Sequence, residues 1–376
     1  MTILHVLEPF ASGITTAVSS IARELPDYTH IVIHGERNWT ESAEKVKRRF
    51  PAGVSFVEWK HAAREISLSG DWKALRSLMA ILKPYAPKNL KKNEQVIVHL
   101  HSSKAGFLGR LACRLLGIKA LIYTPHCGAF LRTDIGFLKR KLYRLFEWIG
   151  GCFGGRVVGC GPSEGELYKK LGKNTIYVSN GVAINKEETL KAKEQKAGNL
   201  ISFTGIASFQ KDPAMWSAVA SACAGNACKE GFSFCWIGDG PESKELKDAA
   251  AQNKAGIVIT GWKTAEEVAE LLEKTAVYFS TAAWEGLPYG VLEAMASGCA
   301  LLLRNVPGNK ELVLPGENGW LFNTKDEAVS HINNMLKDKA KLAAMGKRSR
   351  EIAARDFSLK QMGEAYARIY SSYITR

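Results

Sequence analysis

The chain has 376 residues, of which 46% are hydrophobic and 23% charged, so it is neither disordered nor fibrous. A single core usually stops growing near about 250–300 residues, and the length therefore favours two domains. The net charge is +14, and residues 1–180 hold 27 Lys and Arg against 14 Asp and Glu. A basic first half suggests an anionic partner such as a membrane surface, a phosphorylated lipid or nucleic acid, although a solvated basic face would give the same count.

Three further sequence features narrow the class of protein. No run approaches the ~20 apolar residues of a membrane-spanning helix, and the first residues lack a secretory signal. The eight cysteines contain no Cys-x-x-Cys pair, which favours small buried hydrophobes in a reducing compartment over zinc ligands or disulfides. We therefore expect a cytoplasmic protein.

Apolar runs alternate with helical patterns from the first residue onward. In the first half we expect strands at 2–7, 30–34, 54–57, 96–101, 120–124, 156–160 and 175–178, with helices at about 14–24, 71–83, 103–116, 137–149 and 163–171. In the helix at 137–149, the apolar residues 138, 142, 145, 146 and 149 share one face, and basic residues lie opposite or beside it. We expect this face to pack on the protein's own sheet, and a contact between the basic side and anionic lipid is compatible with that packing.

The alternation restarts after a charged segment at 185–198, which is either a linker or a solvated helix. Further strands are expected at 200–204, 232–237, 256–260, 276–280 and 300–304, and a final helix at about 359–374. This pattern predicts an α/β fold with two doubly wound, Rossmann-like domains, at 1–183 and 184–356. Ligands of such sheets bind beyond the carboxyl ends of the strands, so we expect a ligand in a cleft between the two domains.

Two glutamates bracket the start of a helix that follows the strand at 276–280. Glu285 lies in the loop, and Glu293 lies in a helix that begins near Tyr289 and ends at Gly298. The N–H groups around 287–290 would form an anion or hydroxyl site. Carboxylates accept strongly from hydroxyls, so the pair suits a ligand with phosphates at its centre and sugars at both ends.

The segment EGLPYGVLEAMASG (285–298) resembles the Glu-x7-Glu signature of the retaining nucleotide-sugar glycosyltransferases of family 4, which have the GT-B fold. Other similar pieces lie in the family's order over most of the chain, at 12–13, 99–112, 123–130, around 147, and at 178–182, 204–212, 237–241 and 315–322. The resemblance also implies that the last helix, 357–376, packs back on the first domain.

The resemblance implies a role for each matching residue. Glu293 would bind the ribose hydroxyls of the nucleotide and Glu285 the hydroxyls of the donor sugar. Lys211 would neutralise the diphosphate, His126 would lie beside the reacting sugar, and Gly13 would let the backbone approach the phosphates. His126, Lys211 and Glu285 are the catalytic candidates. The remaining candidates for donor binding are Gly205, Gly238, Gly286, Leu287, Pro288, Tyr289 and Gly290.

The chain departs from the family pattern at two positions. Ile206 stands where the family usually has an arginine, and Ser12-Gly13 replaces the usual Gly-Gly. Either Lys211 carries more of the diphosphate charge, or another arginine such as Arg304 substitutes for the missing one.

Two motifs suggest other ligands. His99 and His101 point to one face of a strand, but no third metal ligand lies nearby in sequence and GT-B enzymes need no metal, so a structural or acceptor-side role is favoured. Gly238-Asp239-Gly240 begins a dinucleotide fingerprint that fails at Ser243, which favours a tight turn near the nucleotide.

The expected function is retaining transfer of a hexose or N-acetylhexosamine from a nucleotide diphosphate sugar, with UDP favoured. The acceptor would be a hydroxyl of a lipid-linked or saccharide molecule in cell-surface polysaccharide biosynthesis. No metal, no other cofactor and no nucleic acid is expected. Association with the inner face of the cell membrane is left open. The alternatives are a non-catalytic protein that binds a nucleotide sugar or lipid, and a nucleotide-sugar epimerase on the same fold.

Overall fold

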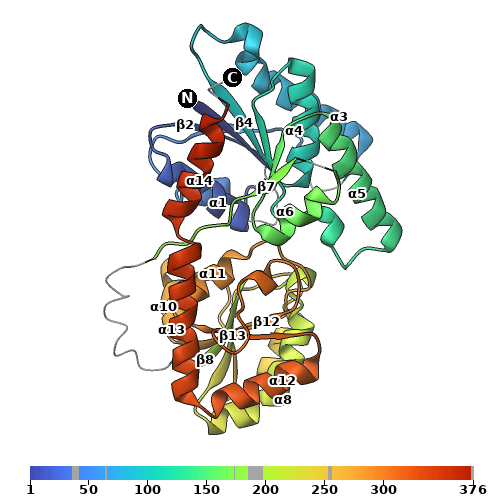
Figure 1. Ribbon diagram of the computed structural model, residues 1–376. Helices are drawn as coiled ribbons and strands as arrows, with labels where there is room; N and C mark the ends of the chain where they lie inside the picture. Colours follow the sequence, from blue (N-terminus) through green and yellow to red (C-terminus); the bar gives the residue numbers. More distant parts are fainter. Residues whose placement is uncertain (36–41, 64–65, 173, 185–197, 253–255, 374–376) are drawn as a thin grey trace. The chain divides into compact units, whose positions relative to one another are not determined.

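The computed structural model describes residues 1–35, 42–63, 66–172, 174–184, 198–252 and 256–373. The chain divides into two compact units (Figure 1), which we call the first domain (residues 1–131, 135–181 and 359–376) and the second domain (residues 132–134 and 182–358). The charged segment, except Gly198, lies outside the described residues, so its conformation stays a prediction.

The first domain is built on a seven-stranded sheet of order β3-β2-β1-β4-β5-β6-β7, in which all neighbours are parallel. Its strands are β1 (Thr2–Leu7), β2 (Thr29–His34), β3 (Ser55–Glu58), β4 (Val96–His101), β5 (Leu121–Thr124), β6 (Arg156–Gly159) and β7 (Thr175–Tyr177). Its helices are α1 (Ser12–Glu24), α2 (Ala43–Lys47), α3 (Leu68–Leu82), α4 (Ser103–Leu116), α5 (Phe137–Cys152), α6 (Pro162–Lys169) and α14 (Leu359–Ser371).

Helices cover both faces of this sheet, as the nearly continuous apolar strands require. On one face, Leu4, Val98 and Leu100 pack with Leu75 and Leu78 of α3. On the other face, a second cluster joins the sheet to α1 and α14 and includes Ile3, Ile97, Ile122, Ile21, Met362, Tyr366 and Tyr370. The last helix, red in Figure 1, thus lies beside α1 and completes the core of the first domain.

The second domain is built on a six-stranded parallel sheet of order β10-β9-β8-β11-β12-β13. The strands are β8 (Leu200–Thr204), β9 (Ser233–Ile237), β10 (Ile257–Ile259), β11 (Thr275–Ser280), β12 (Ala300–Arg304) and β13 (Gly319–Phe322). The helices are α8 (Pro213–Lys229), α9 (Lys244–Gln252), α10 (Ala265–Glu273), α11 (Tyr289–Ala296), α12 (Lys325–Leu336) and α13 (Lys339–Asp356). The predicted α/β fold with two doubly wound sheets is confirmed, and every expected strand forms within about two residues of its predicted bounds.

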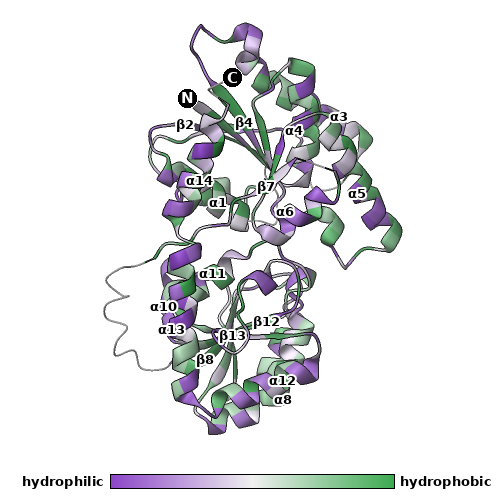
Figure 2. Ribbon diagram, in the orientation of Figure 1, coloured by the Kyte–Doolittle hydropathy of each residue, from purple (hydrophilic) through white to green (hydrophobic). Residues whose placement is uncertain are grey.

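The predicted packing of the helix at 137–149 is wrong. In α5, Leu138 is 80% exposed, and Leu142 and Leu145 are 43% and 48% exposed. The helix instead turns Glu147 inward, where it accepts hydrogen bonds from Arg110 (3.0 Å) and Tyr123 (2.8 Å). A buried, paired carboxylate therefore determines which face of α5 packs, and the apolar stripe mostly stays in contact with solvent. Figure 2 shows hydrophobic and hydrophilic residues mixed along α5.

No helix in the described ranges combines the length and the apolar character that crossing a bilayer requires.

Candidate active site

Each sheet has one point where the strand order reverses, and the candidate residues cluster there. In the second domain this point lies between β8 and β11, and in the first domain between β1 and β4. The chain leaves neighbouring strands in opposite directions at such a point, which opens a crevice beyond their carboxyl ends. Gly205 directly follows β8, Glu285 lies in the loop after β11, and Gly13 lies in α1 just after β1.

Gly205 and Gly238 are required by the close approach of the loops that follow β8 and β9. Their φ angles are +152° and +139°, a region that favours glycine. A Cβ on Gly238 would lie 2.2 Å from the carbonyl oxygen of Gly205, and the amide of Gly205 donates to the carbonyl of Ile237 at 3.0 Å. These glycines therefore let the two loops pack closely at the carboxyl edge of the sheet.

Lys211 ends a short 3-10 turn, η5 (Phe209–Lys211), and the residue after it anchors that turn. Asp212 has φ +52° and caps α8 by accepting from the amide of Met215 at 3.1 Å. Arg304, at the end of β12, donates to Asp212 at 2.8 Å, and Thr281 donates to the carbonyl of Lys211 at 2.8 Å. Arg304 thus lies beside the Lys211 turn and is tied to Asp212.

Lys211 and Glu285 form an ion pair, so the structure brings these two predicted site residues together. Glu285 is buried at 6% exposure, and Lys211 keeps 21% of its side chain exposed. Gln210 donates to the carbonyl of Trp284 at 2.9 Å and so ties the two loops together. The pair places the Lys211 ammonium beside the loop that leads into α11.

The first turn of α11 lies tightly against the end of β8. A Cβ on Gly290 would lie 2.6 Å from Oγ1 of Thr204 and 2.7 Å from the hydroxyl of Tyr278, so only glycine fits. The N-cap residue is Pro288, which has no side-chain group that could cap the helix. The N-cap side chain therefore does not cap the N-terminus of α11, which is the positive end of the helix dipole. Gly286 is held from the other side, because Gly308 approaches its carbonyl so closely that a Cβ there would lie 2.1 Å away.

Glu293, on the second turn of α11, is half-buried. Burial raises the pKa of its carboxyl to about 7. In the described part of the chain, the side-chain carboxyl of Glu293 has no hydrogen-bond or ion-pair partner. A desolvated carboxylate without a protein partner is typical of a ligand-binding position.

The first domain contributes Gly13 and His126. Gly13 lies in the first turn of α1 and follows Ser12, which has φ +55°, and the N-cap Ala11 makes no side-chain cap. His126 follows β5 and has φ +51°, and Cys127 has φ +78°. Consecutive left-handed residues that are not glycine indicate backbone strain that the surrounding structure must maintain. Here the buried Glu164 accepts from the amides of Cys127 (2.7 Å) and Cys160 (2.9 Å) and holds the loop.

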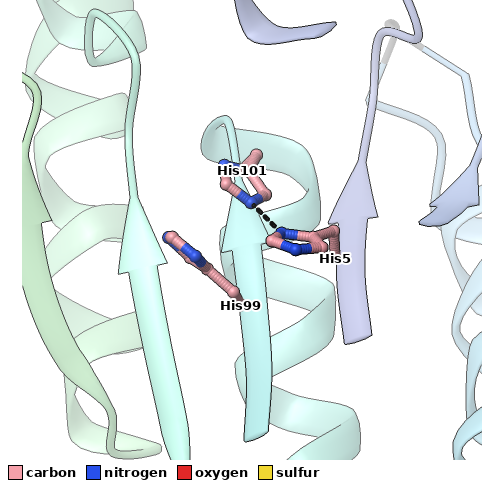
Figure 3. A group of neighbouring side chains, drawn as sticks. All are labelled: His5, His99 and His101. Atoms are coloured by element: carbon pink, nitrogen blue, oxygen red, sulfur yellow. Dashed lines mark hydrogen bonds between the residues drawn. The ribbon is translucent and has the colours of Figure 1, made fainter. Parts of the chain in front are cut away.

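Sequence reasoning missed two histidines that the parallel register brings beside His99 and His101. His5 of β1 pairs in register with His99 of β4, and His30 of β2 lies on the same face. Figure 3 shows His5, His99 and His101, whose ligand atoms lie within 4.8 Å of one another. Every ring nitrogen of these three histidines has a hydrogen-bond partner. His5 bonds to His101 and His30, and His101 bonds to His5 and His126. His99 bonds to Tyr370 and Thr124. A metal ion would have to displace those bonds.

The structure therefore gathers Gly205, Lys211, Gly238, residues 285–290 and Glu293 at one edge of the second sheet. Gly13 and His126 lie at the corresponding edge of the first sheet. The missed residues Glu164, His5 and His30 carry no motif of their own. His5 and His30 are polar residues inside apolar strands, and Glu164 lies in the first turn of α6.

Comparison with known proteins supports the family resemblance. Residues 11–186 match the family model "Glycosyltransferase Family 4", and residues 186–352 match "Glycosyl transferases group 1". The chain is 30% identical over 317 residues to the UDP-Gal:alpha-D-GlcNAc-diphosphoundecaprenol alpha-1,3-galactosyltransferase of Escherichia coli, a match that covers 79% of this chain and 78% of that one.

Two solved structures share the fold over the whole chain. HepE of Anabaena in complex with UDP-glucose superposes with a TM-score of 0.75 at 17% identity, covering 99% of this chain and 100% of that one. Sucrose-phosphate synthase of Thermosynechococcus elongatus superposes with a TM-score of 0.78 at 14% identity, covering 100% and 99%. The chain therefore belongs to family 4 of the glycosyltransferases and is a glycosyltransferase with the GT-B fold.

Proposed function

We propose that this protein transfers a hexose or N-acetylhexosamine from UDP to a hydroxyl of a lipid-linked acceptor in cell-surface polysaccharide biosynthesis, with retention of the anomeric configuration. The observation that carries the proposal is Glu293, a desolvated carboxylate on α11 that has no side-chain partner among the described residues. The Escherichia coli relative is named for a UDP-galactose donor and a diphosphoundecaprenol-linked acceptor, which supports both substrate classes.

In this proposal the residues of the second domain divide the donor among them. Glu293 accepts from the two ribose hydroxyls, because an ionised carboxylate offers two acceptor oxygens. Lys211 and the first N–H groups of α11 bind the diphosphate, and Glu285, released from its ion pair with Lys211, accepts from the sugar hydroxyls. Arg304, once released from its ion pair with Asp212, adds positive charge beside the Lys211 turn and so lessens the effect of Ile206.

The chemical step would break the bond between the anomeric carbon and the diphosphate oxygen. The acceptor oxygen forms its new bond on the same face of the sugar, and the acceptor's proton passes to the departing phosphate. Negative charge grows on the diphosphate in an oxocarbenium-like transition state, and the Lys211 ammonium and the helix dipole stabilise it. His126 contacts the reacting sugar, and no metal ion takes part.

The exposed side of α5 supports a peripheral contact between the first domain and the inner face of the cell membrane. Phe137, Leu138 and Trp148 are 60%, 80% and 52% exposed, and Lys139 and Lys141 are exposed among them. Apolar side chains mixed with cations favour a headgroup interface rich in anionic lipid. This arrangement would bring the protein to a lipid-linked acceptor.

Liposome flotation tests the membrane contact. We expect binding that grows with the fraction of anionic lipid and falls in a Lys139→Glu/Lys141→Glu variant. The matched control, Lys337→Glu/Lys341→Glu, reverses two exposed charges in the second domain and should bind as the wild type does. Flotation that is independent of anionic lipid would remove this part of the proposal.

The transfer activity is tested by measuring UDP release from a panel of UDP-sugars with an undecaprenyl-diphosphate sugar as acceptor. We expect acceptor-dependent release with one hexose or N-acetylhexosamine donor, and an α-linked product from an α-linked donor. Tight binding of UDP-sugars without turnover would instead favour a non-catalytic binding protein. Interconversion of the sugar without transfer would favour the epimerase alternative.

A further inference from the structure

Four histidines of the first domain form one continuous hydrogen-bonded chain that ends at His126. Nδ1 of His30 lies 3.1 Å from Nε2 of His5, and Nδ1 of His5 lies 3.1 Å from Nε2 of His101. Nδ1 of His101 lies 3.0 Å from Nε2 of His126. The dashed line in Figure 3 marks the central link, between His5 and His101. The chain crosses neighbouring strands β2, β1 and β4 and reaches the loop after β5.

At the His30 end of this row of histidines, the donor and the acceptor of the hydrogen bond can be assigned. Nε2 of His30 lies 2.9 Å from the backbone carbonyl of Leu25. A carbonyl oxygen only accepts, so Nε2 of His30 must carry a hydrogen. In a neutral imidazole the other nitrogen is then an acceptor, and Nδ1 of His30 accepts from Nε2–H of His5.

The same step repeats along the chain. Since Nε2 of His5 donates, its Nδ1 accepts from Nε2–H of His101, and Nδ1 of His101 accepts from Nε2–H of His126. All four rings are therefore Nε2–H tautomers, and Nδ1 of His126 is left with a lone pair. Among the described residues, no hydrogen-bond partner faces that nitrogen.

Burial supports the neutral state on which this deduction depends. The three inner rings are at most 3% exposed, and burial lowers the pKa of His5 and His101 far below the usual range. Burial also lowers the pKa of His30, and it lowers that of His126 to about 3. A proton added to any ring would place a cation in a desolvated row of close imidazoles. His126 alone keeps partial exposure, so the chain reaches the surface only there.

We propose that the Leu25 carbonyl, acting through His30, His5 and His101, fixes His126 as the Nε2–H tautomer and so presents Nδ1 as a hydrogen-bond acceptor to the ligand. His30, His5 and His101 are positioning residues. The proposal has a consequence for the ligand, which rests on the proposed function. The ligand group beside His126 must be a hydrogen-bond donor, such as a sugar hydroxyl. A phosphate or carbonyl oxygen at that place would face a lone pair and be repelled.

The test is a long-range ¹H–¹⁵N correlation spectrum of the full chain with ¹⁵N-labelled histidine, assigned with single His→Gln variants. This spectrum shows directly which ring nitrogen carries the hydrogen. We expect the Nε2–H pattern for all four rings. An Nδ1–H form or a tautomeric mixture at His126 would overturn the proposal, as would a change in the His5 and His101 signals on adding one equivalent of Zn²⁺ that shows metal bound there.

A matched pair of variants separates positioning from packing. In His30→Asn the amide oxygen still accepts from Nε2–H of His5, so the His126 tautomer and the turnover should stay close to the wild type. In His30→Leu the acceptor is lost, and we expect a mixed His126 tautomer with lower kcat and an unchanged Kd for UDP. Equal effects of both variants would overturn the proposal. If His30→Leu does not fold, the wild-type and His30→Asn spectra decide.

The outcomes for tautomer and for activity are distinguishable. A mixed His126 tautomer in an active transferase refutes the positioning chain and leaves the proposed function standing. If all four histidines are Nε2–H tautomers but the protein transfers no sugar, the proposed function is refuted and the proposed role of the histidines is not.

Discussion

Replacing Glu293 with Gln should stabilise the protein and weaken its binding of UDP at the same time. Burial raises the pKa of this carboxyl from 4.5 to about 7. Between those values the folded chain binds a proton that the unfolded chain has released, so the unfolding free energy falls as the pH rises through this window. The difference of about 2.5 pH units corresponds to about 3 kcal/mol at pH 8, as an upper value. Gln does not ionise, so Glu293→Gln removes this cost.

The same substitution removes a charged acceptor from the proposed ribose site. Hydrogen bonds to charged groups contribute about 1.5–3 kcal/mol, so the Kd for UDP should rise by roughly 10- to 100-fold. Thermal unfolding at pH 8 and titration calorimetry with UDP measure the two effects. We expect the transition of the second domain to shift upward by several degrees.

Glu270→Gln is the matched control, because Glu270 is an exposed carboxylate on α10 in the same domain. It should change neither stability nor UDP affinity. A Glu293→Gln variant that is less stable than the wild type and binds UDP equally well would refute the reasoning, because Glu293 would then be a structural carboxylate.

The remaining predictions concern pH, His126 and metal. The affinity of the wild type for UDP should fall about tenfold per pH unit below pH 7, because Glu293 of the free protein takes up a proton there that UDP binding must displace. The Glu293→Gln variant should lose this pH dependence. Calorimetry between pH 5.5 and 8 checks this prediction, and equal slopes of affinity against pH for both proteins would contradict it. His126→Ala should lower kcat by roughly 10²-fold or more while the Kd for UDP changes less than threefold, because the proposal places the ring beside the sugar and not beside the nucleotide. Steady-state kinetics and calorimetry check this prediction, and wild-type turnover would exclude the ring from the site. Dialysis against EDTA should leave transfer unchanged; loss of activity restored by one divalent metal would contradict the metal-independent step.

Much of the fold could be predicted because each strand is a short apolar run followed by a helix. Among the described strands, β13 was missed, because it has only four residues, begins with Gly319 and lies at the sheet edge, so its pattern is weak. The charged segment gives no comparison, because most of it lies outside the described residues.

The orientation of α5 could not be predicted because hydropathy treats a carboxylate as a surface group. Glu147 is buried only because Arg110 and Tyr123 stand opposite it, and both are remote in sequence. The same limit applies to the histidine chain. His5 and His30 join it through the register of parallel strands, which no local pattern reveals.

For the candidate site, the spacing of Glu285 and Glu293 predicted the loop and the helix start that the structure contains. The ion pair between Lys211 and Glu285 was not foreseen, because the sequence predicts a ligand for each of them and not the contact that they make with each other. The hydrogen bond from Arg304 to Asp212 could not be predicted either, because these residues are remote in sequence and the bond follows from the packing of β12 beside η5.

The most direct test is a crystal structure of the protein with an intact UDP-sugar. The expected result is density for the ribose with both hydroxyls within hydrogen-bond distance of the Glu293 carboxylate, and for the sugar beside Glu285. Nucleotide density elsewhere, or a bound donor that leaves both carboxylates without contact, would contradict the assignment of this edge of the sheet as the donor site.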